Sequence, residues 1–124
     1  MLRVNRAETT INEGLITLHQ GTPFTGEIAD YAANGTLIEL TSYENGLEHG
    51  PQFEWYPDGS KMLQGQCDRS SAVGEWREWY PTGRLARYDR FNELGDLLER
   101  KRWNESGVIV EDYVGRAPRQ SQIG

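Results

Sequence analysis

The stretch Gly50-Pro-Gln-Phe-Glu-Trp-Tyr-Pro-Asp-Gly-Ser-Lys-Met-Leu63 returns in altered form as Gly74-Glu-Trp-Arg-Glu-Trp-Tyr-Pro-Thr-Gly-Arg-Leu-Ala-Arg87. Both copies open with glycine, pass through Trp-Tyr-Pro-x-Gly, and continue with a second run of residues that favour strands. Glycine supplies the positive φ of a tight turn, and the proline before it presets φ and stops the first strand. Each copy is therefore predicted to form a β-hairpin.

The 24-residue spacing of these two copies extends along most of the chain, which is typical of a repeat protein. The repeated positions are the aromatic column Tyr31, Trp55, Trp79 and Trp103, the turn column Gly35, Gly59, Gly83 and Gly107, and the opening column Gly26, Gly50 and Gly74, with Leu98 in the last copy. Outside the tail, apolar residues do not recur at helical spacing. We expect an all-β fold: a single extended, twisted antiparallel meander sheet of about four to five consecutive hairpins.

The length of 124 residues fits one domain. We expect an N-terminal segment at 1–13, the repeat domain at 14–114 and a flexible tail at 115–124. Within the domain, 14–26 is predicted to form a shorter opening hairpin that caps the sheet, with a turn near 20–23. The basic residues of 100–102 are predicted to protect the opposite edge.

Because 24 is even, equivalent residues of successive hairpins are predicted to share a face of the sheet. The odd positions, predicted to be the packed face, are Tyr31, Trp55, Trp79, Trp103, Leu37, Leu85, Ile109, Tyr43, Cys67 and Phe91. The even positions, which mix acids and aromatics, are Asp30, Glu54, Glu78, Tyr56, Tyr80, Trp76, Met62, Tyr88, Ile38 and Leu40.

The net charge is −6 and the sequence pI is about 4.9, with the acidic excess concentrated in residues 26–66. Such a surface repels nucleic acid and anionic lipid and favours a basic protein partner. The polar N-terminus is not followed by an apolar stretch typical of a signal peptide or membrane span, so we expect a cytoplasmic protein. The single cysteine, Cys67, excludes an internal disulfide framework and fits a reducing compartment.

The sequence carries no recognisable catalytic, metal or cofactor motif. His19 and His49 are the only histidines and fall in different repeats, and the glycines are separated by strands instead of clustering in a phosphate-binding loop. Cys67 is expected to be a buried structural thiol. We therefore expect neither an enzyme nor a cofactor-binding protein.

The segments Gly21-Thr-Pro-Phe-Thr-Gly26 and Asn45-Gly46-Leu-Glu-His-Gly50, with the recurrent Trp-Tyr-Pro-x-Gly, resemble the MORN-repeat variants and, within them, the YwqK-like antitoxin family. The resemblance covers about 14–113. It implies a sheet of antiparallel hairpins and, for bacterial members, an immunity partner of a protein toxin. The linker at 68–73 lacks the Asn-Gly-x-x-His-Gly pattern that precedes the second repeat.

The candidate toxin-binding residues are Asp30, Glu54, Tyr56, Trp76, Glu78 and Tyr80. One interpretation is a negative, aromatic stripe that meets the lysines and arginines of a basic toxin; the other is a solvated sheet face. The alternative function is a non-catalytic scaffold that assembles through sheet edges or contacts membranes. We expect a monomer or a weak edge-paired dimer.

Overall fold

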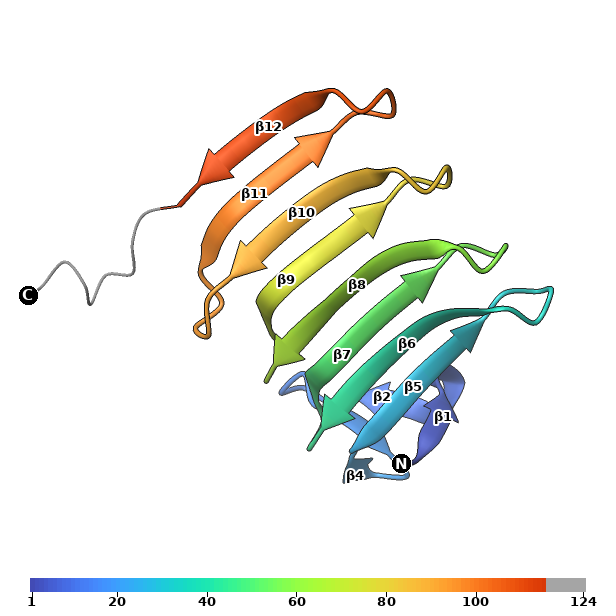
Figure 1. Ribbon diagram of the computed structural model, residues 1–124. Coiled ribbons are helices and arrows are strands. Elements are labelled where there is room, and N and C mark those ends of the chain that lie inside the picture. Colours follow the sequence, from blue (N-terminus) through green and yellow to red (C-terminus); the bar gives the residue numbers. More distant parts are fainter. Residues whose placement is uncertain (116–124) are drawn as a thin grey trace, which may run out of the picture.

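The computed structural model describes residues 1–115, and its regular structure is almost entirely β (Figure 1). Nine strands form one sheet in the order β1-β5-β6-β7-β8-β9-β10-β11-β12, and β2-β3-β4 form a small second sheet. The predicted all-β hairpin meander is confirmed, although the chain forms two sheets instead of one. Among the described residues, no helix is long and apolar enough to cross a membrane.

The bounds of the elements follow the repeat. The large sheet contains β1 (Arg3–Asn5), β5 (Gly26–Tyr31), β6 (Leu37–Glu44), β7 (Leu47–Trp55), β8 (Lys61–Asp68), β9 (Ser71–Trp79), β10 (Leu85–Phe91), β11 (Leu97–Trp103) and β12 (Ile109–Val114). The small sheet contains β2 (Thr9–Ile11), β3 (Thr17–His19) and β4 (Thr22–Pro23), and a 3-10 helix, η1, spans Arg6–Glu8.

The turns between paired long strands are built as the sequence predicts. Gly35, Gly59, Gly83 and Gly107 have φ values of 87°, 89°, 92° and 87°. Each of these glycines donates its backbone N–H to the carbonyl three residues earlier, as Gly59 does to Tyr56. A side chain at these positions would be strained, because L residues rarely adopt such φ values.

A β-bulge follows each of these turns and changes which residues share a face. The register passes from Glu54 opposite Leu63 to Trp55 opposite Lys61, so that Met62 is skipped. The same irregularity skips Ile38, Ala86 and Val110, again at 24-residue spacing. One extra residue reverses the alternation of side chains along a strand, so parity changes between the first and second strand of every hairpin.

The predicted division into odd and even faces is therefore wrong for the part of each second strand that follows the bulge, whereas Leu37, Leu85 and Ile109, which precede it, lie beside the aromatic column as predicted. One face, which we call the acidic face, carries the acids Asp30, Glu54 and Glu78. Tyr43, Cys67 and Phe91, expected opposite these acids, lie on the same face as they do. The other face, the tryptophan face, carries Tyr31, Trp55, Trp79 and Trp103, together with Leu40 and Tyr88, which were expected beside the acids.

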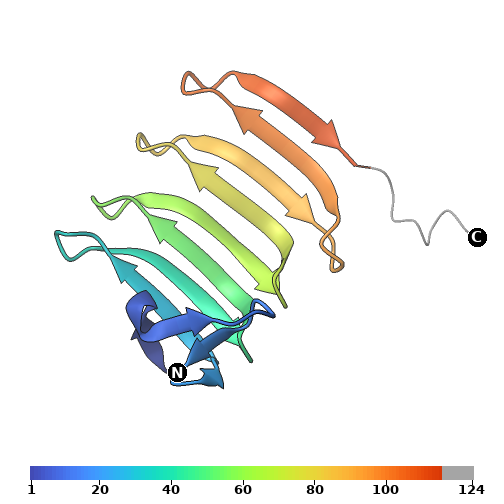
Figure 2. The same ribbon diagram turned by 180° about the vertical axis from the view of Figure 1, so that it is seen from behind.

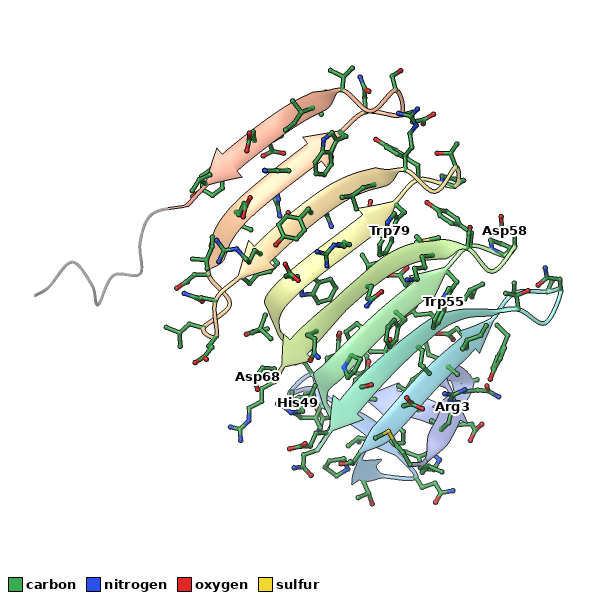
Figure 3. The ribbon with its side chains drawn as sticks, viewed as in Figure 1. Arg3, His49, Trp55, Asp58, Asp68 and Trp79 are labelled. Carbon is green, nitrogen blue, oxygen red and sulfur yellow. The ribbon has the colours of Figure 1, made fainter. Side chains whose placement is uncertain are left out.

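The cluster of buried hydrophobic residues also lies on the face opposite the predicted one, although Ala29 and Leu40, on the tryptophan face, are buried too. Val4, Phe24 and Ile28 are 6%, 2% and 0% exposed and form a cluster against which Tyr43 packs. Ile28 lies on the acidic face, one alternation away from Asp30. Trp55 and Trp79, at corresponding ends of β7 and β9 (Figure 3), are only half-buried. The tryptophan column is thus a packed surface stripe and not the core.

The N-terminal segment supplies the second layer of that core. It lies in front of β5 and β6 when the sheet is seen from behind (Figure 2). The predicted opening hairpin is present as β3 and β4, with its turn at 20–21, but it packs against the sheet instead of extending it. β1 pairs in parallel with β5, so the large sheet begins before the expected boundary at Gly14.

The C-terminal edge strand is β12, not the basic strand β11. Arg100, Lys101 and Arg102 lie between two neighbouring strands, and each forms an ion pair with an acid. The interpretation of these residues as protection for an exposed edge is therefore wrong. Gly115 donates its backbone N–H to Leu98. The rest of the predicted flexible tail, 116–124, lies outside the described residues.

Candidate functional site

The three acids of the predicted stripe lie in one cross-strand row on the acidic face. The register places Asp30 opposite Glu39, Glu39 opposite Glu54, Glu54 opposite Leu63 and Leu63 opposite Glu78. The row continues as Arg87, Arg102 and Glu111 on β10, β11 and β12. Neighbouring strands are about 4.8 Å apart, so side chains of the row are close enough to interact.

The two ends of the acidic part of this row are neutralised. The guanidinium of Arg6, on η1, contacts Asp30 at 3.1 Å and Glu39 at 3.0 Å. On the other side, Arg87 lies 3.3 Å from Glu78. The contact of Arg6 with the stripe is not evident from the sequence, since it forms only when the N-terminal segment folds back onto β5 and β6.

Glu54 is the acid of this row that has no ion pair among the described residues. Partial burial raises its pKa, and the negative charges of Glu39 and Glu78 raise it further. All three causes disfavour the charged form of the side chain. A cation brought to this position would relieve that unfavourable arrangement.

Glu54 lines a hollow of about 140 Å³ between β6 and β9. The lining residues are Glu39, Thr41, Glu48, Gln52, Phe53, Glu54, Leu63 and Trp76. Glu48 was not among the candidates, because it occupies a different repeat position from the stripe. Three carboxylates around a small hollow suit an ammonium or guanidinium group. Among residues 1–115, no three His, Cys, Asp or Glu side chains are arranged to hold a metal ion.

Trp76 both lines the hollow and packs on the sheet. Its ring lies over Gly65, where a Cβ atom would overlap the ring. Its Nε1 donates to the carbonyls of Gln66 and Val73 at 3.0 and 3.2 Å. The ring is held in place, so the part of it that faces the hollow is preorganised for contact.

Tyr56 and Tyr80 make structural contacts between hairpins. The Tyr56 hydroxyl donates to the carbonyl of Trp79 at 2.7 Å, and the Tyr80 hydroxyl donates to that of Trp103 at 2.7 Å. Burial raises the pKa of Tyr56, with a smaller contribution from the charge of Glu78. Their hydroxyls are thus engaged in holding successive hairpins together, which leaves the rings as their contribution to any interface.

The remaining reactive side chains have structural surroundings. Cys67 is 7% exposed, which confirms the expected burial, and burial with the charge of Glu48 raises its pKa to about 11. Such a thiol stays protonated and unreactive at neutral pH. His49 lies 3.8 Å from Glu44 and 3.4 Å from Asp68, at the end of the sheet away from the repeat turns (Figure 3).

Comparison with known proteins supports the repeat class. The profile of the MORN repeat variant matches residues 72–93, which span most of β9 and all of β10. A solved structure titled "Crystal Structure of TarM" is similar at 13% identity and a TM-score of 0.42, over 86% of this chain and 19% of that chain. The MORN match supports a MORN-repeat protein and suggests a protein-interaction module. Membership of the YwqK-like antitoxin family stays a prediction.

Proposed function

We propose that this protein is an immunity protein that binds a basic bacterial toxin through the acidic face and covers the toxin's active site or substrate surface. The observation that carries the proposal is the hollow around Glu54. Its carboxylate lacks an ion pair among the described residues while the flanking acids are matched by Arg6 and Arg87. A lysine or arginine of the toxin would complete the row.

The arrangement of the sheet supports the same proposal. Among the described elements, the N-terminal segment covers the acidic face near β5 and β6 and reaches the start of β7, and no other element covers this face over β8 to β10 (Figure 2). Ion pairs that form only in a complex give specificity and accelerate association. The net charge of −6 adds long-range attraction to a basic partner.

The unfavourable effect of Glu54 on stability is also consistent with a role in binding. A half-buried carboxylate between two other acids opposes folding, and such destabilising arrangements are characteristic of binding sites. The scaffold alternative does not require an unmatched acid at this position.

The test is a pull-down from native cells with the full chain as bait, followed by binding kinetics with the recovered partner. Recovery of a basic toxin domain is expected. The double variant Glu54→Lys, Glu78→Lys should then slow association at least about tenfold at low salt, since charge complementarity sets the association rate. The matched control is Glu93→Lys, Glu105→Lys, which reverses two exposed turn acids and should have little effect.

Two results would contradict the proposal. Association that is equally fast for both double variants would remove the acidic face from the interface. Recovery of only cytoskeletal, membrane or self partners, together with strong co-sedimentation with liposomes, would favour the scaffold alternative.

A further inference from the structure

Exposed large hydrophobic residues are concentrated at β12 and the turn before it. Five of the eleven large hydrophobic residues that are exposed lie between 108 and 114. They are Val108, Ile109, Val110, Tyr113 and Val114, at 57%, 45%, 63%, 45% and 74% exposure. Positions equivalent to Tyr113 in earlier repeats include Thr41 and Asp89, which are 7% and 3% exposed. The difference arises because those strands have a neighbour on both sides.

Among the described residues, β12 is also the outermost strand at its end of the sheet. Within residues 1–115 it pairs only with β11, so one side of its backbone presents unpaired N–H and C=O groups. An extended segment that added to this edge would satisfy those groups and cover the exposed apolar side chains. This edge lies at the opposite end of the sheet from the N-terminal segment (Figure 1).

The charged residues of β12 indicate which kind of partner strand would fit its free edge. Glu111 and Asp112 lie at the centre of the strand, one on each face, between apolar residues. On its paired side, β11 presents Arg102 opposite Glu111 and Lys101 opposite Asp112. Cross-strand pairs of opposite charge stabilise a sheet. A strand on the free side is best matched by the same pattern, adjacent basic residues flanked by apolar ones.

A second copy of this chain does not fit that requirement. The antiparallel registers that keep most of β12 paired with its own copy place Glu111 opposite Glu111 or Asp112 opposite Asp112. Like charges directly opposite each other destabilise strand pairing. The two acids therefore act against self-association of an edge that is otherwise apolar.

We propose that the free edge of β12 receives an extended segment of a partner protein that carries two adjacent basic residues between apolar residues. This surface is separate from the hollow at Glu54 and lies at the C-terminal end of the sheet. The partner segment adds a strand through backbone hydrogen bonds, and Glu111 and Asp112 select its charge.

The test uses the full chain and a labelled peptide with the β11 sequence Leu-Leu-Glu-Arg-Lys-Arg-Trp. The control peptide has glutamate at the three basic positions. We expect the basic peptide to bind at least about tenfold more tightly than the acidic one and to slow hydrogen–deuterium exchange in β12. Asp112→Lys should weaken binding of the basic peptide and strengthen binding of the acidic one.

Matched variants separate this proposal from the proposed function. Val114→Lys should reduce peptide binding, while Leu94→Lys, at an equally exposed apolar residue in a turn, should not. Glu54→Lys, Glu78→Lys should leave peptide binding unchanged. The inference is overturned if the two peptides bind equally, or if Asp112→Lys changes the binding of neither peptide. It is also overturned if the basic peptide leaves hydrogen–deuterium exchange in β12 unaltered, or if the chain dimerises through β12 instead.

Discussion

At the scale of single residues, Glu54 affects the stability of the fold and lies at the centre of the proposed binding site. Its carboxyl has a pKa above the usual 4.5, because it is partly buried and lies beside two other acids. The folded protein therefore binds a proton more readily than the unfolded chain does. Stability contributed by the protonated form is fully present below about pH 4.5 and is lost as the pH rises through the higher folded pKa.

Glu54→Gln removes this loss, so the variant should be more stable than the wild type at pH 7. The expected gain is about 0.5 kcal/mol, because solvent screens a half-buried charge. Urea unfolding of both proteins at pH 7 and pH 4 measures it, and the difference should disappear at pH 4. Glu93→Gln, at an exposed turn position, is the control. If the free energies of unfolding of the two proteins differed by the same amount at both pH values, the charge of Glu54 would not be the cause of the difference.

Gly65 is a second residue whose role is purely steric. Its backbone is not in the positive-φ region, but a Cβ atom there would overlap the ring of Trp76. Gly65→Ala is therefore expected to destabilise the protein by about 1 to 3 kcal/mol through overpacking. In a Trp76→Leu background the same change should cost much less. Equal costs in the two backgrounds, measured by urea unfolding, would show that the ring is not the cause.

At the scale of elements, the unit of construction is the hairpin with its bulge and its link to the next hairpin. The bulge turns the second strand over, so that Glu39 on β6 and Arg87 on β10 reach the acidic face in the row of Asp30 and Glu78. The links are the hydroxyls of Tyr56 and Tyr80, each bonded to a backbone carbonyl of the following hairpin. Asn34 and Arg84 add contacts between neighbouring turns through the carbonyls of Pro57 and Ser106.

Tyr56→Phe and Tyr80→Phe each remove one such hydrogen bond without changing the ring. We expect each to lower the free energy of unfolding by about 1 kcal/mol, the usual net contribution of a hydrogen bond. Tyr113→Phe, at a position 45% exposed on the edge strand, should have almost no effect. If all three variants were equally stable, the hydroxyls would not be linking the hairpins.

At the scale of the whole molecule, stability is distributed unequally along the sheet. The buried cluster of Val4, Phe24 and Ile28 lies at the N-terminal end, where two layers pack together. From β8 to β12 the sheet is a single layer among the described residues, held by neighbouring strands and by ion pairs such as Arg100 with Asp89 at 2.8 Å. Repeat arrays of this kind open from their less supported end.

Hydrogen–deuterium exchange should therefore be slowest in β5 and β6 and become faster toward β12. Phe24→Ala should cost about 3 to 5 kcal/mol, since the side chain is 2% exposed and its removal leaves a cavity. The same variant should reduce the protection of β5 and β6 more than that of β10 and β11. Uniform protection along the sheet would contradict this unequal distribution.

Much of the fold was predictable from the sequence, because the features that specify the hairpins are local and repeat at a fixed spacing. The 24-residue spacing and the turn glycines specify where each hairpin turns. The alignment of Asp30, Glu54 and Glu78 on one face follows from the same even period. These features depend on residues close together in the chain. Because the repeat length is even, equivalent residues in the first strand of each hairpin lie on the same face of the sheet.

The tertiary structure alone decided the rest, because the contacts concerned join distant residues or depend on an extra residue in a strand. The bulges at 38, 62, 86 and 110 placed the residues that follow them in the second strands on the face opposite the predicted one. Folding of the N-terminal segment onto the sheet brought Arg6 to Asp30 and left Glu54 unmatched. The sequence by itself determined the hairpins; their packing determined which face is buried and which acid lacks an ion pair among the described residues.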